Sequence, residues 1–496
     1  MSKLARTLRQ YPRTFWIANT MELFERWAWY GFFMLFANYL TQSTDLGALG
    51  LSQTEKGIIM GVGTGILYLL PVITGSIADK YGYRRVLFVA FLIYVSAFLI
   101  MPLCKSFAAV FATYLYLALG AALFKPIVSA TVAKTTNDET SSVGFGIFYM
   151  MVNIGAFVGP LFALYLKKLS FDKVFYISSI IIGINILFLL FYHEPEHEKK
   201  EEPLKDSLKT IFRNIGIAFT DKKFVIFLMI VAGFWTMYNQ LFFMLPVFID
   251  QWVDTSQLYQ FFQEYWPWIT STYGTGNGQL QAEFITNVDA MYIILFQVMV
   301  STLIMKWKPL SSMITGFLVC SIGMFLTVAT QDVLFILFSI LIFGLGEMAG
   351  SPKITEYIGK MAAKDKVALY MGFSYIPMAI GNMLAGFISG FVYEKMSDKI
   401  TLAGKEIARQ NFDIPQVSEQ FTKTDYLQAL ANQLKLSEFE LTQYLWQEYH
   451  PGRIWVVLMG IGLTAVLALY IYDRKLIRKK GQRKVVVQRP KPEKGI

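Results

Sequence analysis

The chain has 496 residues, of which 55% are hydrophobic and only 16% are charged, and its mean hydropathy is +0.44. These values exclude an ordinary soluble enzyme and are typical of a protein that crosses a membrane several times. The formal net charge of +10 does not indicate a nucleic-acid partner, because much of the excess flanks predicted membrane segments.

Twelve segments are long and apolar enough to cross about 30 Å of hydrocarbon as helices. They predict an all-α membrane protein built from two six-helix halves around one central site. The first segment is too long and too charged for a cleavable signal peptide, so we expect it to stay in the mature protein. The predicted spans cover residues 14–41, 55–78, 85–104, 107–133, 143–166, 174–192, 223–249, 289–306, 310–330, 333–361, 368–394 and 453–472.

The first span carries three charges at membrane depth, Glu22, Glu25 and Arg26. Each central charge costs roughly 2.5 to 3.5 kcal/mol, so all three are expected to face a bundle interior. Helical spacing puts them on one stripe with Tyr30, which lies four residues after Arg26. One interpretation is a structural Glu22–Arg26 ion pair. We favour proton coupling, because one arginine cannot neutralise two carboxylates and the remaining one can exchange a proton near neutral pH.

The loop between the second and third spans contains a G-x-x-x-D-x-x-x-x-R-R pattern, which starts at Gly75. This pattern resembles the signature loop of the major facilitator superfamily. Asp79 is predicted to cap or bridge neighbouring helix ends, and Arg84 and Arg85 to hold the loop at the cytoplasmic face. The alternative is an ordinary positively charged turn on the inner side.

Ionisable residues at membrane depth recur in the fourth and tenth spans, as Lys125 and Glu347. A lone buried lysine is costly, so Lys125 needs a carboxylate across the cavity, and Glu347 is one candidate. A pair that forms in one conformation and breaks in another would give a two-state element that a proton or an anionic substrate biases. Asp289, at the start of the eighth span, is expected to lie less deep.

Two outer loops are longer than a minimal bundle needs. Residues 250–288 contain Trp252, Trp266 and Trp268, which predict an interfacial aromatic belt. Residues 395–452 predict a small helical excursion, in which Ser437 and Glu440 have capping-box spacing. No partner is assigned to either loop.

Composition divides the chain into four parts. Residues 1–192 are the predicted N-terminal half, 193–222 a cytoplasmic linker with an amphipathic stretch, 223–472 the C-terminal half and 473–496 a basic cytoplasmic tail. Basic residues beside the first and last spans place both termini in the cytoplasm of a plasma membrane, here a bacterial inner membrane. Two distant cysteines and three histidines outside the span centres indicate neither a disulfide nor a metal site, and no cofactor is expected.

Six motifs in order across both halves resemble the proton-dependent oligopeptide transporters of the major facilitator superfamily. The resemblance covers roughly residues 14–394 and the last span, and leaves out the long outer loops and the tail. The motifs are Glu22-x-x-Glu25-Arg26 with Tyr30-Gly31, Lys125-Pro126, Phe148-Tyr149 with Asn153 and Gly155, Phe234-Trp235 with Gln240, Gly346-Glu347 with Ser351-Pro352, and Met371-Gly372 with Gly381-Asn382.

The resemblance implies a symporter that imports di- and tripeptides with protons by alternating access. Its proton-coupling role falls on Glu22, Glu25 and Glu347. Arg26 and Lys125 would receive the peptide carboxylate, and Glu347 would face the peptide ammonium. Between these poles, the peptide backbone would be held by neutral side chains, those of Tyr30, Tyr68 and Asn153. Tyr68 has the alternative of a packed interfacial tyrosine, and Asn153 that of an interhelix hydrogen bond.

Four positions depart from the family pattern, and three of them, Asn239, Asp289 and Ser374, belong to the expected substrate site. Phe33 and Asn239 stand where many members carry an arginine and a glutamate that gate the outer side, so this gate must rely on apolar and amide contacts. Asp289 replaces an asparagine and adds negative charge near the ammonium pole. Ser374 replaces a tryptophan and is expected to widen the pocket. Proton stoichiometry and peptide size stay open.

Two other classes of function remain. One is a proton-coupled carrier of another amphoteric or peptide-like solute, and the other is a membrane receptor that does not transport. The receptor is disfavoured because it would not need costly charges on three spans. An enzyme is not expected, because the spans show no spacing of a nucleophile with a base or of metal ligands. The expected partners are short peptides, protons and membrane lipid, and the chain is expected to be a monomer.

Overall fold

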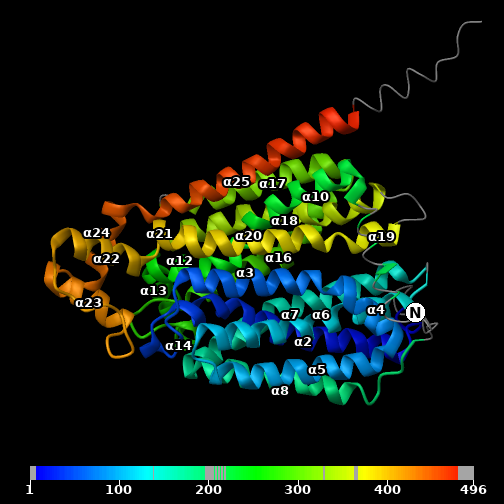
Figure 1. Ribbon diagram of the computed structural model, residues 1–496, viewed down its shortest axis with the longest axis horizontal. Coiled ribbons are helices and arrows are strands. Elements are labelled where there is room, and N and C mark those ends of the chain that lie inside the picture. The colour runs from blue at the N-terminus through cyan, green and yellow to red at the C-terminus, as the bar shows by residue number, and fades with distance from the viewer. Residues whose placement is uncertain are drawn as a thin grey trace, which may run out of the picture.

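The fold is seen in a computed structural model whose described residues are almost all helical, as the sequence predicts (Figure 1). The structure describes residues 7–137, 139–195, 219–327, 330–361 and 367–478, together with residues 206, 209, 210, 213 and 216. Most of the predicted linker 193–222 and of the basic tail 473–496 therefore lies outside the described residues.

We call residues 13–192 the N-terminal half and residues 222–478 the C-terminal half. The helices of the N-terminal half are α2 (Arg13–Thr41), α3 (Gln53–Leu69), α4 (Pro71–Tyr81), α5 (Tyr83–Ile100), α6 (Phe107–Lys134), α7 (Ser141–Leu169) and α8 (Phe171–Phe188). The long helices of the C-terminal half are α10 (Lys222–Tyr238), α16 (Val288–Ile304), α17 (Pro309–Leu326), α18 (Val333–Met361), α20 (Tyr375–Phe387) and α25 (Ile454–Ile471).

Shorter helices extend or connect these spans. They are α11 (Gln240–Phe243), α12 (Leu245–Trp252), α13 (Ser256–Tyr265), α14 (Pro267–Tyr273), α15 (Ala282–Thr286), α19 (Val367–Gly372), α21 (Tyr393–Met396), α22 (Lys399–Gln410), α23 (Lys423–Leu434) and α24 (Glu438–Tyr449). We call residues 393–450 the cap. Figure 1 shows the cap at one end of the bundle, the cap end. The opposite end, where α2 begins and α25 ends, is the terminal end.

Ten helices within the described ranges are long and apolar enough to cross a membrane, or eleven if the bent pair α3 and α4 is one span. These two helices meet at 45°, beside Pro71. The charged helix α2 falls outside this composition-based count. The predicted span 223–249 is interrupted after Asn239 and again at Met244, because neither residue continues a regular helix.

The segment Tyr370–Gln410 runs for 41 residues, which is about 60 Å of helix and twice the thickness of the hydrocarbon. Its last helix, α22, is rich in charged residues and lies in the cap, so it extends beyond the membrane. The cap confirms the predicted helical excursion. Its helix α24 begins with the expected capping box, in which Ser437 and Glu440 satisfy each other's backbone N–H groups.

Small residues let helices of the bundle approach to backbone contact. In the N-terminal half, a Cβ on Gly31 of α2 would lie 2.9 Å from the carbonyl oxygen of Gly159 on α7. Between the halves, a Cβ on Gly57 of α3 would lie 2.3 Å from the oxygen of Gly386 on α20. Larger side chains at these positions would push the helices apart.

The tryptophans predicted as one aromatic belt have two different environments. Trp266 and Trp268 are exposed on the hairpin of α13 and α14, which is the exposure that an interfacial belt requires. Trp252 is buried and donates a hydrogen bond from Nε1 to the carbonyl of Ser397 at 2.8 Å. The prediction was therefore wrong for Trp252, because the cap covers it.

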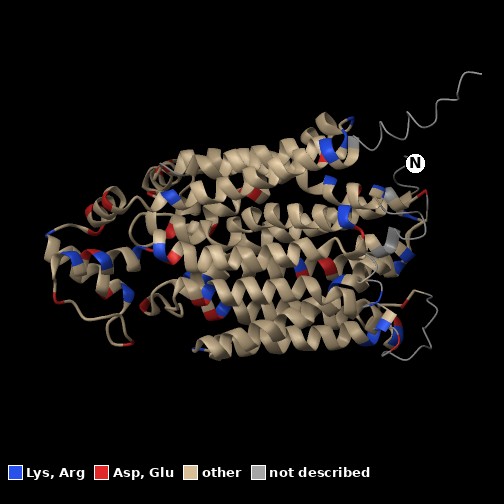
Figure 2. Cartoon of the chain, turned by 45° about the horizontal axis from the view of Figure 1, so that its top comes forward, with Lys and Arg blue, Asp and Glu red and all other residues tan. Residues whose placement is uncertain are grey.

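The signature loop lies at the terminal end, with Arg84 and Arg85 exposed. Tyr83 donates its hydroxyl to Asp79 at 3.4 Å, so Asp79 joins α4 to the first turn of α5. The backbone N–H at the start of α5 is capped by Glu194, which accepts from Tyr83 N at 2.6 Å. Charged residues in general gather at the two ends of the bundle, and few lie between them (Figure 2).

Candidate functional site

The three charges of α2 form one buried network. Arg26 Nε lies 3.2 Å from Glu22 Oε1, one turn away, and the same guanidinium pairs with Glu25. Tyr94 of α5 donates its hydroxyl to the other oxygen of Glu25. Glu25 is 0% exposed and Glu22 is 3% exposed. Arg26 therefore holds both carboxylates, and this network has a formal charge of −1 when both are ionised.

Helix packing fixes the position of this network. A Cβ on Gly155 of α7 would lie 2.6 Å from Arg26 Cβ, so only glycine lets α7 pass so close to the arginine. Gly155 is the glycine of the fifth-span motif. The guanidinium carbon of Arg26 also lies 5.8 Å from the centroid of the Tyr30 ring, which completes the predicted polar stripe.

Lys125 is held by aromatic contacts. Its Nζ lies 4.5 Å from the centroid of the Tyr68 ring, and this ring stacks on Tyr375 of the C-terminal half at 6.3 Å. No carboxylate lies within ion-pair distance of Lys125 among the residues that the structure describes. The contact with Glu347 is therefore not formed in this conformation.

The acidic residues of the C-terminal half gather around Tyr238. Its hydroxyl donates to Glu347 Oε1 at 2.8 Å, whereas Glu347 Oε2 and Asp289 Oδ1 are buried without a hydrogen-bond partner in the described part of the chain. Asp289 is only 5% exposed and lies within electrostatic range of Glu347. Asp289, which is expected to lie less deep in the membrane, is buried because its neighbours cover the start of α16.

Two tyrosines connect the basic and acidic groups. Tyr30 lies within electrostatic range of Arg26 and Lys125, and Tyr238 lies within range of Tyr30 as well as Glu347. The structure therefore brings the charged residues predicted on α2, α6 and α18 to one region between the halves. The buried groups of the two halves differ in their balance of charge. Arg26 and Lys125 lie with Glu22 and Glu25 in the N-terminal half, whereas Glu347 and Asp289 of the C-terminal half have no cation within ion-pair distance among the described residues.

The remaining predicted substrate residues are less closely joined to this region. Asn153 is exposed on α7, and no hydrogen bond of its side chain is found within the described residues. Asn239 is 7% exposed and donates to the carbonyl of Trp235 at 2.8 Å. Ser374 immediately precedes α20 and donates to the carbonyl of Met371 at 2.7 Å. Both hydrogen bonds join residues that are close in the chain.

Apolar contacts meet at Phe33, on the side of the charged region nearer the cap. Its ring lies 5.8 Å from Phe242 and 6.1 Å from Phe243, both on α11 of the other half. Asn239 lies at the junction of α10 and α11. The apolar contact expected for the uncharged pair is therefore present between the halves.

An ion pair that the sequence did not predict lies nearer the cap end. Lys167 Nζ of α7 lies 2.6 Å from Glu283 Oε1 of α15, and the Glu283 side chain is fully buried. Asn38 of α2 donates to the same oxygen at 2.9 Å. Gln42 donates to Asp250 of α12 at 2.7 Å. These bonds hold the halves together at the cap end.

Three partners of the site were missed by sequence reasoning. Tyr94 stands in an apolar span outside all six motifs, and nothing local marks it. Tyr238 lies three residues after Trp235 of a motif, on the same helix face, which was an available signal. Lys167 lies just after the predicted span 143–166, on the predicted outer side, where the usual charge rule expects few basic residues, and its partner Glu283 explains its position.

A family model described as Major Facilitator Superfamily matches residues 20–262. The multidrug resistance protein MdtH of Proteus mirabilis (strain HI4320) is 23% identical over 373 residues, which cover 73% of this chain and 84% of the relative. The di-/tripeptide transporter of Lactococcus lactis subsp. lactis (strain IL1403) is 23% identical over 249 residues, 48% of this chain and 49% of the relative.

The structure is similar to a crystal structure of the peptide transporter POT in complex with sulfate. The TM-score is 0.67 at 16% sequence identity, and the match covers 93% of this chain and 95% of the other. At this identity the likeness establishes the fold, which is the predicted twelve-helix arrangement in two halves. These two relatives are named as a multidrug resistance protein and a di-/tripeptide transporter, so their names do not identify one solute.

Proposed function

We propose that this chain, which belongs to the major facilitator superfamily, is a proton-coupled symporter that imports di- and tripeptides by alternating access. Membership and fold make it a membrane transporter. The proposal adds the solute, the coupling ion and the direction of transport. It also assigns the cap end to the outer side of a bacterial inner membrane, with both termini in the cytoplasm.

The observation that carries the proposal is that Lys125 of the N-terminal half has no carboxylate within ion-pair distance, and Glu347 and Asp289 of the C-terminal half have no cation, among the described residues. A peptide is a zwitterion, so it needs a cationic pole and an acidic pole with neutral hydrogen-bonding groups between them. Arg26 and Lys125 supply the first pole in our proposal, and Glu347 and Asp289 supply the second. Tyr30 and Tyr68 lie among these groups and would bind the peptide backbone.

Lys125 is the natural ligand for the peptide carboxylate, because no carboxylate of the described chain neutralises it. Arg26 already holds Glu22 and Glu25, so a peptide carboxylate would compete with these side chains. Protonation of Glu22 would release part of the guanidinium for the substrate. This competition would couple the proton to the peptide, since each favours the binding of the other.

The acidic pole offers a second proton site. Asp289 and Glu347 together carry a formal charge of −2, and Tyr238 is the only donor to either of them among the described residues. A proton or a substrate ammonium would relieve their repulsion. We assign Glu347 both roles, with Asn153, Asn239 and Ser374 as further substrate contacts after the helices move.

Alternating access fits the contacts between the halves. The contacts of Phe33 with Phe242 and Phe243, together with the Lys167–Glu283 pair, close the cap end, which in our proposal is the outer side. Opening it would require the halves to rock and these bonds to break. We further propose that one chain is a complete transporter, because both poles lie within it.

A second candidate is a proton-coupled carrier of another amphoteric solute. Asp289 favours this candidate, because an extra carboxylate suits a solute with more than one positive charge. A receptor that does not transport remains a third. Neither needs a different fold.

Uptake of labelled Ala-Ala into liposomes, with and without an inward proton gradient, tests these functions. Symport predicts accumulation that requires the gradient. Binding without flux would favour the receptor, and flux that is indifferent to the gradient would exclude proton symport. Gradient-driven uptake of a labelled amphoteric solute with two positive charges, together with no uptake of Ala-Ala, would favour the second candidate.

A further inference from the structure

The cap reaches from the C-terminal half to the N-terminal half at two helix ends. Lys423, in the first turn of α23, donates from Nζ to the carbonyl of Thr41 at 2.8 Å and to that of Leu51 at 2.9 Å. Thr41 is the last residue of α2, so its carbonyl has no partner within the helix. A cation at this point also complements the negative end of the helix dipole.

The second helix end is the start of α3. Glu394 of α21 accepts from the backbone N–H of Thr54 at 2.6 Å, where the helix has unpaired donors and the positive end of its dipole. Gln53 donates to Asp398 at 3.0 Å next to it. The cap thus binds the end of α2 with a cation and the start of α3 with an anion.

The contact continues along the loop between these two helices. Thr424 donates from Oγ1 to Asp45 at 3.1 Å and from its backbone to Ser43 Oγ at 3.3 Å. Each hydrogen bond joins residues of different halves. They are therefore lost if the halves separate at the cap end.

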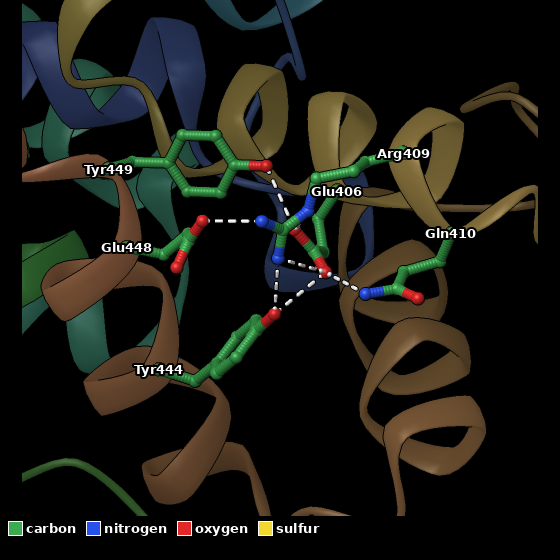
Figure 3. Close-up of polar contacts among 6 residues, drawn as sticks. All are labelled: Glu406, Arg409, Gln410, Tyr444, Glu448 and Tyr449. Carbon is green, nitrogen blue, oxygen red and sulfur yellow. Dashed lines mark hydrogen bonds and ion pairs between the residues drawn. The ribbon is translucent and has the colours of Figure 1, made fainter.

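The cap is itself held rigidly enough to transmit this contact. Glu406 of α22 accepts from Arg409 and Gln410 of its own helix and from Tyr444 and Tyr449 of α24, as Figure 3 shows. Its four donors outweigh the effect of burial and lower the pKa of Glu406 to about 2. The carboxylate therefore stays ionised and binds α22 to α24 throughout the physiological pH range.

We propose that the cap is a latch that holds the cap end of the transporter closed by capping α2 and α3 from the opposite half. The inference rests on the proposed alternating access. It gives the cap a role in the free-energy difference between the two shapes of the transporter, because the bonds exist only while the cap end is closed. α2 also carries Glu22, Glu25 and Arg26, so the latch holds the helix on which the proposed proton site lies.

Distances between spin labels in the full chain test the latch without substrate or gradient. Labels are attached at Lys105→Cys, in the loop between α5 and α6, and at Glu264→Cys of α13, in a background with Cys104→Ala and Cys320→Ala. In the protein with native latch residues, the two labels should be separated by one short distance. Lys423→Met and Glu394→Ala should each add a longer one and raise the ratio of open to closed by about tenfold or more.

Lys405→Met is the matched control, because Lys405 is exposed and donates to the carbonyl of Lys395 within the cap. It should leave the distances unchanged. The latch is overturned if both contact variants keep the short distance, or if the control shifts as much as they do. Should Lys423→Met fail to fold, Glu394→Ala tests the other helix end independently.

A disulfide between Ser43→Cys and Thr424→Cys provides a second measurement. Oxidation should hold the short distance, stop uptake and allow both to recover on reduction. Full uptake by the oxidised protein would overturn the latch. If the chain with native latch residues transports no peptide at all, the proposed function fails, while the spin-label distances still decide whether the cap holds the halves together.

Discussion

The buried charges of the two halves are balanced in different ways. In the N-terminal half, Arg26 pairs with Glu22 and Glu25, and Lys125 brings the formal charge of the group to zero. In the C-terminal half, Asp289 and Glu347 have no cation within the described residues, and Tyr238 donates a hydrogen bond to Glu347 alone. The first group can stay buried by itself, whereas the second needs a proton or a ligand cation.

This difference indicates which side of the site responds to which partner. Lys125 is available to bind a substrate carboxylate. Asp289 and Glu347 are available to bind a substrate ammonium. A transporter with equal poles would bind a zwitterion in either orientation. The unequal poles here predict one orientation, and the following experiments test it.

The largest effect is expected for Lys125→Ala, which removes the cation that has no carboxylate partner. We expect gradient-driven uptake of Ala-Ala to fall by more than about 100-fold, because one charge-assisted contact to the carboxylate is lost in a low-dielectric site. Lys134→Ala, at the end of the same helix, is the control. Near-normal accumulation by the Lys125 variant would remove this residue from the site.

The next effect concerns the ion pair between the halves. Lys167→Met leaves the Glu283 carboxylate buried without its cation, which should destabilise the closed shape by about 3 to 5 kcal/mol. The double variant Lys167→Met with Glu283→Met should recover most of this loss, because no charge stays buried. Thermal unfolding of the purified proteins measures both. Equal losses in the single and double variants would show that the pair contributes packing and not charge.

Glu347→Gln should have a smaller effect on binding, and this effect should differ between Ala-Ala and its N-acetylated form. We expect the affinity for Ala-Ala to fall about 10- to 100-fold and that for its N-acetylated form to change less, because only the free amine offers an ammonium. Asp289→Asn is the matched variant. If it affects free-amine peptides more than Glu347→Gln does, Asp289 is the primary acidic ligand. Equal loss for both ligands would contradict the proposed orientation.

The sequence predicted much of the N-terminal group, because helical spacing alone puts Glu22, Arg26 and Tyr30 on one face. It could not predict Tyr94, since nothing in the local pattern tells which helix packs against Glu25. The burial of Asp289 was also missed, because it depends on which neighbouring helices cover the start of α16. Contacts between segments far apart in the chain, such as Lys423 with Thr41, need the tertiary fold.

The smallest effect is expected in the cap, where the donors around Glu406 hold the pKa of its carboxylate at about 2, below the usual value near 4.3. A lowered pKa in the folded state means that this stabilisation is complete above about pH 4.3 and is lost as the pH falls toward about 2. Glu406→Gln should cost about 1 to 3 kcal/mol at neutral pH. The ratio of hydrogen-exchange rates in α24 between variant and native protein should approach one as the pH falls through this range. A ratio that does not depend on pH would show that the ionised carboxylate does not hold the cap together, and the latch would then need another source of rigidity.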